Sequence, residues 1–295
     1  MNLSRKKLTT YAKFIPLKSN NVFLTIGKIV VSLFAFWYVF QHVDLSSIYE
    51  KMKNVKWHYV VCAFFLFNTS QMASAARLGY ILKNHKAEIT FPKNLLLYYI
   101  GMAYNLFLPG GIGGDAYKIL QINRIHKYKK KTLVSALLLD RLLGLLALLI
   151  LILTGLTFFN LGYPKSVWIF SAILVLIFSF IGTKIFFKQG ISFGLGFLWS
   201  LLIQLLQGLS FYSIVWSLGY KSLASAIIFW ISSVATAIPV FLGGMGAREL
   251  IFEKLAQTFQ INSTLGITAA LIFSLITLVS SFVGLVLDWI PKNHE

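Results

Sequence analysis

Residues 107–115 read Phe-Leu-Pro-Gly-Gly-Ile-Gly-Gly-Asp, and residues 239–249 read Pro-Val-Phe-Leu-Gly-Gly-Met-Gly-Ala-Arg-Glu. If Pro109 is skipped, both stretches give Phe-Leu, two glycines, a bulky apolar residue, a glycine, a small residue and then a charge. A glycine costs about 1 kcal/mol and a proline about 3 kcal/mol inside a helix, so each stretch predicts a break in a helix. Irregular backbone within a membrane must be satisfied by protein or by a wet cavity, so the matched pair predicts a site.

The composition around these breaks is that of an integral membrane protein. The chain has 295 residues, of which 57% are hydrophobic and only 12% are charged, whereas soluble domains contain about 25% charged residues. Lys and Arg number 27 against nine acidic residues, which gives a net charge of +18. Because the basic residues lie between apolar runs, we interpret them as orientation signals and contacts with anionic lipid head groups, not as a nucleic-acid surface.

Apolar stretches long enough to cross a bilayer predict the helices. Full spans are expected near 22–41, 57–80, 132–157, 166–187, 194–217 and 265–289. Two further stretches, 94–122 and 223–256, each contain one glycine break and are predicted to form two half-helices that turn back as a re-entrant hairpin. The predicted fold is an all-α polytopic membrane protein with about six full transmembrane helices and two glycine-broken re-entrant hairpins in an inverted repeat.

The positions of the basic residues predict the orientation. The loop after the first broken stretch is the most basic in the chain, with Lys118, Arg124, Lys127, Lys129, Lys130 and Lys131. This loop and the basic N-terminal tail both belong on the cytoplasmic side, which requires that 94–122 turn back without crossing. The second broken stretch then enters from outside, and the helices 57–80 and 194–217 that precede the two breaks run in opposite directions.

The domain boundaries follow from the same pattern. We expect a basic cytoplasmic tail over 1–21, a single transmembrane domain over 22–290 and a short cytoplasmic C-terminus over 291–295. The first apolar run has no small-x-small cleavage pattern after it, so it predicts a retained helix rather than a signal peptide. Segment 42–56 lies outside in this arrangement and is predicted to be an amphipathic surface helix, from apolar residues three or four apart: Leu45, Ile48, Met52 and Val55.

Ionisable side chains within membrane helices are costly and indicate function by default. They are Arg77, Asp115, Asp140, Arg141, Arg248, Glu249 and Glu253. Glu249 and Glu253 are four residues apart on one helix face, so they should repel unless a cation or an arginine intervenes. We expect that arginine to be Arg77, Arg141 or Arg248.

Backbone amides at the start of a half-helix and the planar guanidinium of arginine both suit a phosphate group. Glycine lets such a ligand approach the backbone closely. The predicted substrate-binding set is Arg77, Gly110, Gly111, Gly113, Gly114, Asp115, Asp140, Arg141, Gly243, Gly244, Gly246, Arg248, Glu249 and Glu253. A structural alternative remains open for Asp140-Arg141, Arg248-Glu249 and Arg77, which in that interpretation lie near the membrane boundary and pin helices while the arginines snorkel to head groups.

Other motifs carry no chemistry. Residues 111–116 match G-x-G-x-x-A, but they follow a membrane helix instead of a strand, which argues against a dinucleotide site. The five histidines are scattered and the single cysteine is Cys62, so neither a metal site nor a disulfide is predicted. We expect no catalytic residues and no cofactor. Without an ATP site, transport would be downhill or coupled to an ion or the membrane potential, and Glu249 or Glu253 would be the proton carrier.

Three motifs in order resemble the lysylphosphatidylglycerol synthase transmembrane-region family: Asn105 with Leu108 to Asp115, then Asp140-Arg141, then Pro239 with Gly243 to Glu249. The resemblance extends from about residue 20 to 290. It implies a lipid-translocating membrane protein, because the family includes the flippase portion of the multiple peptide resistance factor, which moves aminoacylated phosphatidylglycerol between leaflets. About six residues follow the last predicted helix, so no lipid-aminoacylating domain and no synthesis of the modified lipid are expected here.

The sequence therefore predicts flipping or scrambling of an anionic or phosphate-bearing lipid across the cytoplasmic (inner) membrane, by a multi-pass transporter with both termini in the cytoplasm. Its predicted partners are a phospholipid or other phosphate-bearing lipid and anionic membrane lipids, without nucleic acid; an oligomer is compatible with this. Two alternatives stay open. One is a membrane enzyme or accessory protein that acts on a lipid-linked phosphate or sugar, although no Asp-x-Asp metal motif is present. The other is a non-transporting scaffold, which would not require two matched breaks.

Overall fold

The computed structural model describes residue 37 and residues 45–107, 113–160, 162–187, 190–237 and 246–289, and the regular structure in them is helical. The tail 1–21, the C-terminal residues 291–295 and the predicted first span 22–41, apart from Trp37, lie outside these residues. The helices are α3 (Leu45–Lys53), α4 (Trp57–Asn84), α5 (Phe91–Phe107), α6 (Gly113–His126), α7 (Lys130–Leu156), α8 (Lys165–Phe187), α9 (Gly190–Ser217), α10 (Leu223–Ala237), α11 (Ala247–Ala256) and α12 (Ser263–Trp289).

Five of these helices, α4, α7, α8, α9 and α12, are long and apolar enough to cross a membrane. They correspond to the five predicted spans that fall within the described residues, so the prediction of an all-α polytopic membrane protein is confirmed. Their lengths of 23 to 28 residues exceed the 20 or so that a hydrocarbon core of about 30 Å requires. Large apolar side chains are exposed along them, for example Phe178 at 68% and Leu198 at 60%, as a lipid-facing surface requires.

Each glycine-containing stretch forms two short helices instead of one span. The first gives α5 and α6, with 17 and 14 residues, and the second gives α10 and α11, with 15 and 10 residues. At a rise of about 1.5 Å per residue they are roughly 15 to 26 Å long, which is less than the thickness of the hydrocarbon core. The two members of each pair pack against each other. The predicted breaks are therefore confirmed as interruptions between packed half-length helices.

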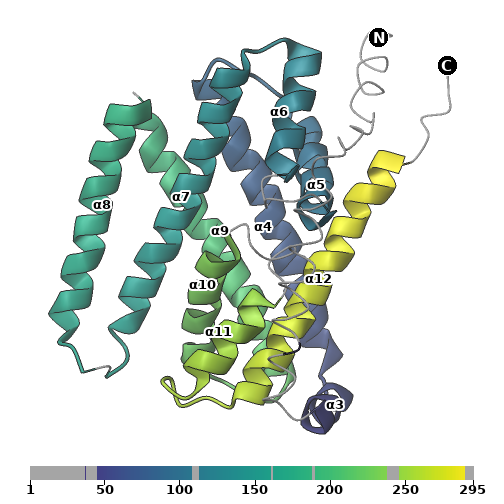
Figure 1. The fold of residues 1–295 in the computed structure, drawn as a ribbon, viewed down its shortest axis with the longest axis vertical. Helices are drawn as coiled ribbons and strands as arrows, with labels where there is room; N and C mark the ends of the chain where they lie inside the picture. The colour runs from purple at the N-terminus through teal and green to yellow at the C-terminus, as the bar shows by residue number, and fades with distance from the viewer. Residues whose placement is uncertain are drawn as a thin grey trace.

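The two pairs of short helices occupy opposite halves of the molecule (Figure 1). α5 descends from the upper end to mid-height and α6 returns to the upper end, whereas α10 rises from the lower end to mid-height and α11 returns to the lower end. The long helices before the pairs, α4 and α9, run in opposite directions and pack extensively on each other.

The packing pattern around one pair of short helices is repeated around the other. α4 packs on α5 and on α7, and α6 packs on α7. In the same way, α9 packs on α10 and on α12, and α11 packs on α12. The halves are joined by α5 on α12 and by the corresponding contact of α10 on α7. α8 follows the first set of four and packs on α7 and α9, outside this correspondence.

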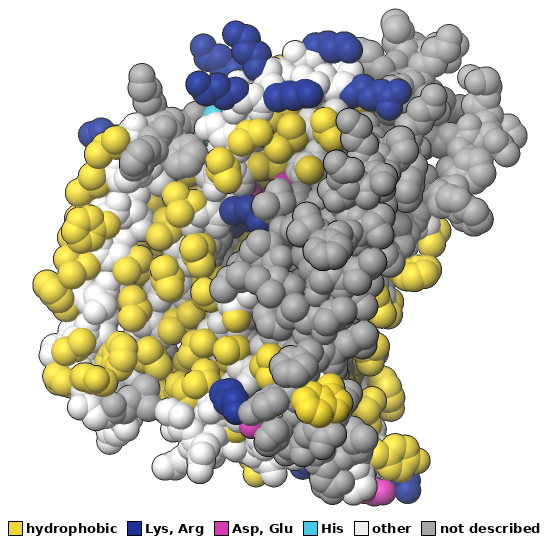
Figure 2. Space-filling view, in the orientation of Figure 1, with side chains coloured by type: hydrophobic (Ala, Val, Ile, Leu, Met, Phe, Trp, Pro, Cys, Tyr) yellow, Lys and Arg dark blue, Asp and Glu magenta, His cyan; other side chains and the backbone are white. Residues whose placement is uncertain are grey.

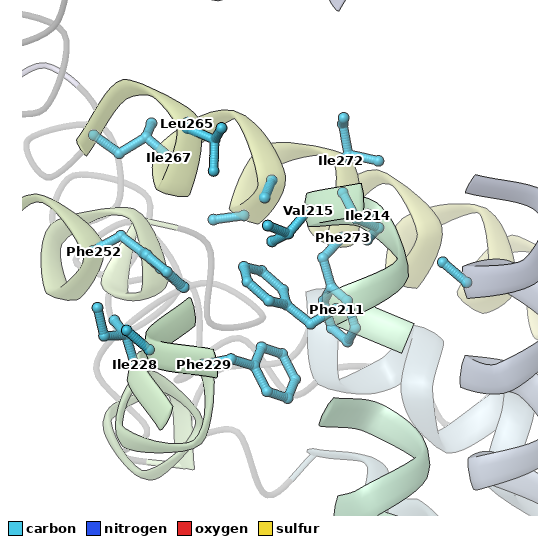
Figure 3. Close-up of a cluster of buried hydrophobic side chains, with 14 of the residues drawn as sticks. Phe211, Ile214, Val215, Ile228, Phe229, Phe252, Leu265, Ile267, Ile272 and Phe273 are labelled. Carbon is cyan, nitrogen blue, oxygen red and sulfur yellow. The ribbon is translucent and has the colours of Figure 1, made fainter. Parts of the chain in front are cut away.

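Each half has its own apolar core. One core, around α4 to α7, includes Tyr98, Tyr117 and Leu143. The other, around α9 to α12, is rich in phenylalanine, with Phe211, Phe229, Phe252 and Phe273 among its buried residues. Figure 3 shows the rings of Phe211, Phe229 and Phe273 gathered between these helices. Ring centroids lie 4.8 Å apart for Phe211 and Phe229 and 5.0 Å apart for Phe229 and Phe273, within the range of favourable aromatic pairs.

The two ends of the molecule differ in charge and in their connecting segments. Lys and Arg side chains gather at the upper end, where α6 ends and α7 begins (Figures 1 and 2). At the lower end the predicted amphipathic helix is present as α3, which lies across the bundle instead of along it (Figure 1). Ile48 and Val55 are buried, in agreement with the apolar face predicted for this segment.

Candidate functional site

The first break places a carboxylate at the start of α6. The amide of Gly114 donates to Asn105 Oδ1 at 2.8 Å, so the last turn of α5 holds the first turn of α6. A Cβ at Gly114 would overlap the carbonyl group of Gly101, so only glycine lets α5 and α6 approach this closely. Asp115 follows in the first turn of α6. A negative charge is favoured there by the partial positive charge of the helix N-terminus.

Asp115 has two cationic partners. The Nε atom of Arg141, on α7, donates to Asp115 Oδ2. The Nζ atom of Lys118, one turn along α6, lies 3.5 Å from Asp115 Oδ1. The same ammonium group lies 3.4 Å from the centroid of the Tyr98 ring, which adds a cation–π contact from α5. The Lys118 side chain is 8% exposed and that of Arg141 40%, so Asp115 joins a buried cation to a half-exposed one.

The neighbouring residue on α7, Asp140, forms the deeper half of the same cluster. Arg77 on α4 binds it in a bidentate manner, with Nε to Oδ1 at 2.8 Å and Nη2 to Oδ2 at 2.9 Å. The hydroxyl of Tyr98 also donates to Asp140 Oδ2 at 3.2 Å. Arg77 Nη1 donates to Ser200 Oγ on α9 at 2.7 Å. Four helices thus contribute to one buried network, in which the Arg77 and Asp140 side chains are 7% and 10% exposed.

This network, called the charge cluster below, consists of Arg77, Lys118, Arg141, Asp115 and Asp140, together with Tyr98. Its three cations and two carboxylates leave one formal positive charge in excess. Such an excess is costly in a membrane domain unless an anion or water compensates for it. The arrangement is therefore suited to receive one further anionic group.

The depth of the cluster bears on the structural alternative for Asp140 and Arg141. They lie ten and eleven residues after Lys130, where α7 begins. That distance is about 15 Å along the helix. The pair therefore lies within α7 and not at its end, while its position relative to the membrane boundary stays a prediction. The guanidinium group of Arg77 likewise donates hydrogen bonds to Asp140 and Ser200 within the bundle.

The second break presents a different arrangement. Gly246 has a φ of 85°, in the left-handed region that glycine adopts without strain, and it caps α11. The fully buried carboxylate of Glu249 accepts from the Gly246 amide at 2.9 Å and from the hydroxyl of Ser274, on α12, at 3.2 Å. Glu249 therefore supplies the glutamate half of a capping box, from its carboxylate to the N-cap amide, and fixes the start of α11.

Arg248 is held by aromatic rings. Its guanidinium carbon lies 4.8 Å from the centroid of Phe229 on α10 and 4.5 Å from that of Phe273 on α12. Its Nε atom is buried and has no hydrogen-bond partner among the described residues. A guanidinium group can direct two N–H donors at one anion such as a phosphate, so Arg248 is a candidate for binding an anion.

The sequence required a cation or an arginine near Glu249 and Glu253. Glu253 Oε2 lies 3.3 Å from a cation, Lys254 Nζ, whereas Glu249 accepts from the amide of Gly246 and the hydroxyl of Ser274. Arg77 and Arg141 belong to the other break. The partners of Glu249 were not predicted because only ionic partners were considered.

The predicted site residues fall into two groups at the two breaks. Arg77, Gly113, Gly114, Asp115, Asp140 and Arg141 lie together at the first, and Gly246, Arg248, Glu249 and Glu253 lie along or beside α11 at the second. Gly110, Gly111, Gly243 and Gly244 lie outside the described residues. Sequence reasoning missed Lys118, Tyr98, Ser200, Phe229 and Phe273. The i,i+3 spacing of Asp115 and Lys118 was a usable signal, but nothing local indicated the others.

A bundle with five apolar helices long enough to cross a membrane defines the class of polytopic all-α membrane proteins. Comparison with known families makes the assignment more specific. The chain belongs to the family described as the lysylphosphatidylglycerol synthase TM region, whose model matches residues 25–190. The match includes the first break and Asp140-Arg141 but ends before the second break, so it is shorter than the resemblance proposed from the motifs. No curated protein matches the chain.

Proposed function

We propose that this protein translocates an anionic or phosphate-bearing lipid across the cytoplasmic membrane, by flipping or scrambling. The observation that carries the proposal is the charge cluster at the first break, where three cations and two carboxylates lie together within a bundle of apolar helices. A scaffold has no need for an excess buried charge, and such groups commonly mark a substrate pathway. Membership of a family associated with lipid handling supports the same conclusion.

In this proposal α5 with α6 and α10 with α11 are re-entrant hairpins related by an inverted repeat. Their half-membrane lengths, their placement in opposite halves and the corresponding packing of the helices around them support it. Inverted repeats place a binding site near the bilayer midplane, where it can be exposed to either side in turn. A lipid needs a polar path only for its head group, since its tails remain in the bilayer.

The basic upper end in Figure 2 supports a cytoplasmic location for that end, because cytoplasmic loops are enriched in Lys and Arg. The first hairpin would then open from the cytoplasm and the second from outside. Both termini would be cytoplasmic, with the basic tail 1–21 among the cytoplasmic signals.

The two breaks would act in succession on one phosphate group. The charge cluster supplies an excess positive charge, while Arg248 supplies a guanidinium group already oriented by Phe229 and Phe273. Charge-assisted bonds from arginine to phosphate are among the stronger hydrogen bonds, and preorganised donors lower the cost of ordering. Asp115 and Glu249 would position the cations and helix starts and would not bind the anion themselves.

The proposal is tested by reconstituting the purified chain in liposomes with phosphatidylglycerol labelled on its acyl chain. Dithionite added outside bleaches only the outer leaflet, so bleaching of about half the label is expected for liposomes without protein. Bleaching well beyond half is expected with the protein, provided that an entrapped soluble dye stays protected. Bleaching that stops at half in sealed, protein-containing vesicles would refute translocation.

A further inference from the structure

One arginine of the charge cluster lies on the outer surface of the bundle. Along α7 the exposed apolar residues Val134 (40%), Leu138 (56%) and Leu145 (36%) occur at intervals that place them on one helix face. Arg141 falls into the same series, three residues after Leu138 and four before Leu145, and its side chain is 40% exposed. A cation therefore interrupts a stripe that otherwise suits lipid tails.

The depth of this arginine is inconsistent with simple snorkelling. Arg141 lies eleven residues inside α7, or roughly 16 Å from its basic end. A long side chain reaches the interface from positions near helix ends, not from the middle of a span. Asp115 is shared between Arg141 and the buried Lys118, so two cations meet one carboxylate here, and Arg141 is the exposed one of the two.

The neighbouring helix continues this surface towards the basic end. α6 packs on α7 and exposes Ala116, Leu120 and Arg124 at intervals of four residues. Beyond Arg124, the connection into α7 carries exposed Lys127, Lys129, Lys130 and Lys131. Cations thus occur at two levels on the α6–α7 face, at its basic end and at Arg141, and apolar side chains lie between them. Figure 2 also shows basic atoms well below the basic end, next to acidic atoms and with apolar side chains beside them.

We propose that the α6–α7 face is a lateral entry route for an anionic phospholipid from the leaflet at the basic end. The lipid phosphate is first attracted by the exposed lysines, while its acyl chains lie against Val134, Leu138 and Leu120, and the phosphate then moves down this face to bind at Arg141. Charge complementarity identifies the occupant, because apolar stripes alone would accept any lipid, whereas the excess positive charge favours a negatively charged head group. This route rests on the proposed function and specifies where its substrate enters.

The test is a photocrosslinking experiment with a matched control position on another helix. p-Benzoylphenylalanine is introduced at Leu138, or at Leu198 on α9, in the full chain. Both are leucines eight residues from the basic end of their helix, with exposures of 56% and 60%, and α9 carries no charged residue. The protein is reconstituted in vesicles with equal amounts of phosphatidylglycerol and phosphatidylcholine, irradiated, and analysed for adducts by mass spectrometry.

At Leu138 we expect phosphatidylglycerol adducts to exceed phosphatidylcholine adducts about threefold, because a partly exposed charge interaction gives a preference of this size. At Leu198 we expect equal amounts of the two adducts. Arg141→Gln should remove the enrichment at Leu138, whereas Arg141→Lys should keep most of it. If Arg141→Gln does not fold, the comparison of Leu138 with Leu198 decides alone. Equal ratios at the two positions, or an enrichment that survives Arg141→Gln in folded protein, would overturn the route.

The outcome is separable from that of the proposed function. Enrichment at Leu138 without bleaching of labelled lipid beyond half would support the binding face and refute translocation. Bleaching beyond half without enrichment would support translocation and refute this entry route.

Discussion

The two broken helical stretches have similar sequences and half-length helices, yet they solve the problem of buried charge in different ways. At the first break five charged side chains from three helices form a network, with Tyr98 and Ser200 as additional partners. At the second break a single guanidinium group lies over two aromatic rings, and the adjacent carboxylate accepts a hydrogen bond from the amide that caps the helix. The difference teaches that a matched glycine motif specifies where a helix is interrupted, not what the interruption holds.

This contrast has a physical basis in the neighbours of each break. α4 and α7 bring Arg77 and Asp140 to the first break, whereas α10 and α12 bring Phe229 and Phe273 to the second. A buried ion pair depends strongly on each partner, because removal of one leaves the other uncompensated. A cation between aromatic rings depends on shape and on planarity. Paired substitutions at the two breaks distinguish the buried ion pair from the cation that lies over aromatic rings.

The largest expected effect is the loss of stability on removing the carboxylate of the deep ion pair. Asp140→Leu leaves Arg77 buried without its bidentate partner, which should cost about 3 to 5 kcal/mol. Glu249→Leu at the second break leaves an amide and a hydroxyl unsatisfied, which should cost about 1 to 3 kcal/mol. Thermal unfolding in detergent, followed by tryptophan fluorescence, should therefore show the larger drop in Tm for Asp140→Leu.

A double variant serves as the control for this pair. Arg77→Met combined with Asp140→Leu removes both charges and should recover part of the stability lost in Asp140→Leu alone. If Asp140→Leu is no less stable than Glu249→Leu, the ion pair at the first break does not contribute more to stability than the helix cap at the second.

The next effect concerns the close approach of α5 and α6. Gly114→Ala places a Cβ against the carbonyl group of Gly101, and the backbone shift should cost about 1 to 3 kcal/mol and reduce lipid translocation. The aligned position in the second break is Ala247, so Ala247→Gly should cost only about 0.5 to 1 kcal/mol. For each variant, the yield of monodisperse protein measures the effect on stability, and the rate of dithionite bleaching in liposomes measures the effect on translocation. Equal tolerance at the two positions would contradict the asymmetry.

A smaller, functional effect distinguishes the two arginines. Arg248→Lys keeps a charge but loses the planar group that lies over Phe229 and Phe273, so translocation should slow about tenfold. Arg141→Lys replaces a half-exposed cation that pairs through one nitrogen, and a twofold decrease or less is expected. Initial bleaching rates in liposomes with matched protein content give both values. A lysine at 248 that supports the native rate would remove the phosphate-clamp role of Arg248.

The smallest expected perturbation is a topology test at exposed residues. With Cys62 replaced by serine, Lys129→Cys at the basic end should resist an impermeant thiol reagent added to intact cells, as should Lys7→Cys in the N-terminal tail. Lys165→Cys, at the opposite end of α7 and α8, should be labelled. Labelling of Lys129 but not Lys165 would invert the orientation. Labelling of only one of Lys7 and Lys129 would mean that the first broken stretch crosses the membrane.

Hydropathy and glycine content were sufficient for the helices, because both are local properties of the chain. The runs beginning near Trp57, Lys165 and Ser263 have the length and composition of spans, and Pro109 with its neighbouring glycines predicted the interruption between α5 and α6. The amphipathic spacing of residues 45–55 likewise predicted α3.

The partners of the charged residues were not predictable in this way. Arg77 and Asp140 are 63 positions apart, and Asp115 and Arg141 are 26 apart, so their pairing depends on how α4, α6 and α7 pack. Nothing around Phe229 or Phe273 distinguishes them from other phenylalanines of the core. A buried glutamate can be satisfied by a cation or by uncharged hydrogen-bond donors. Glu249 accepts from the helix-cap amide of Gly246 instead of from an arginine.

In the proposed function, cations at the two breaks carry an anionic head group across the membrane. The most direct measurement compares two acyl-labelled lipids in the same proteoliposomes, phosphatidylglycerol and a neutral glycolipid without phosphate. Dithionite should bleach the labelled phosphatidylglycerol well beyond half and leave about half of the glycolipid protected, and Arg248→Gln should abolish the difference. Equal bleaching of both lipids by the native protein, or protection of both, would contradict the account.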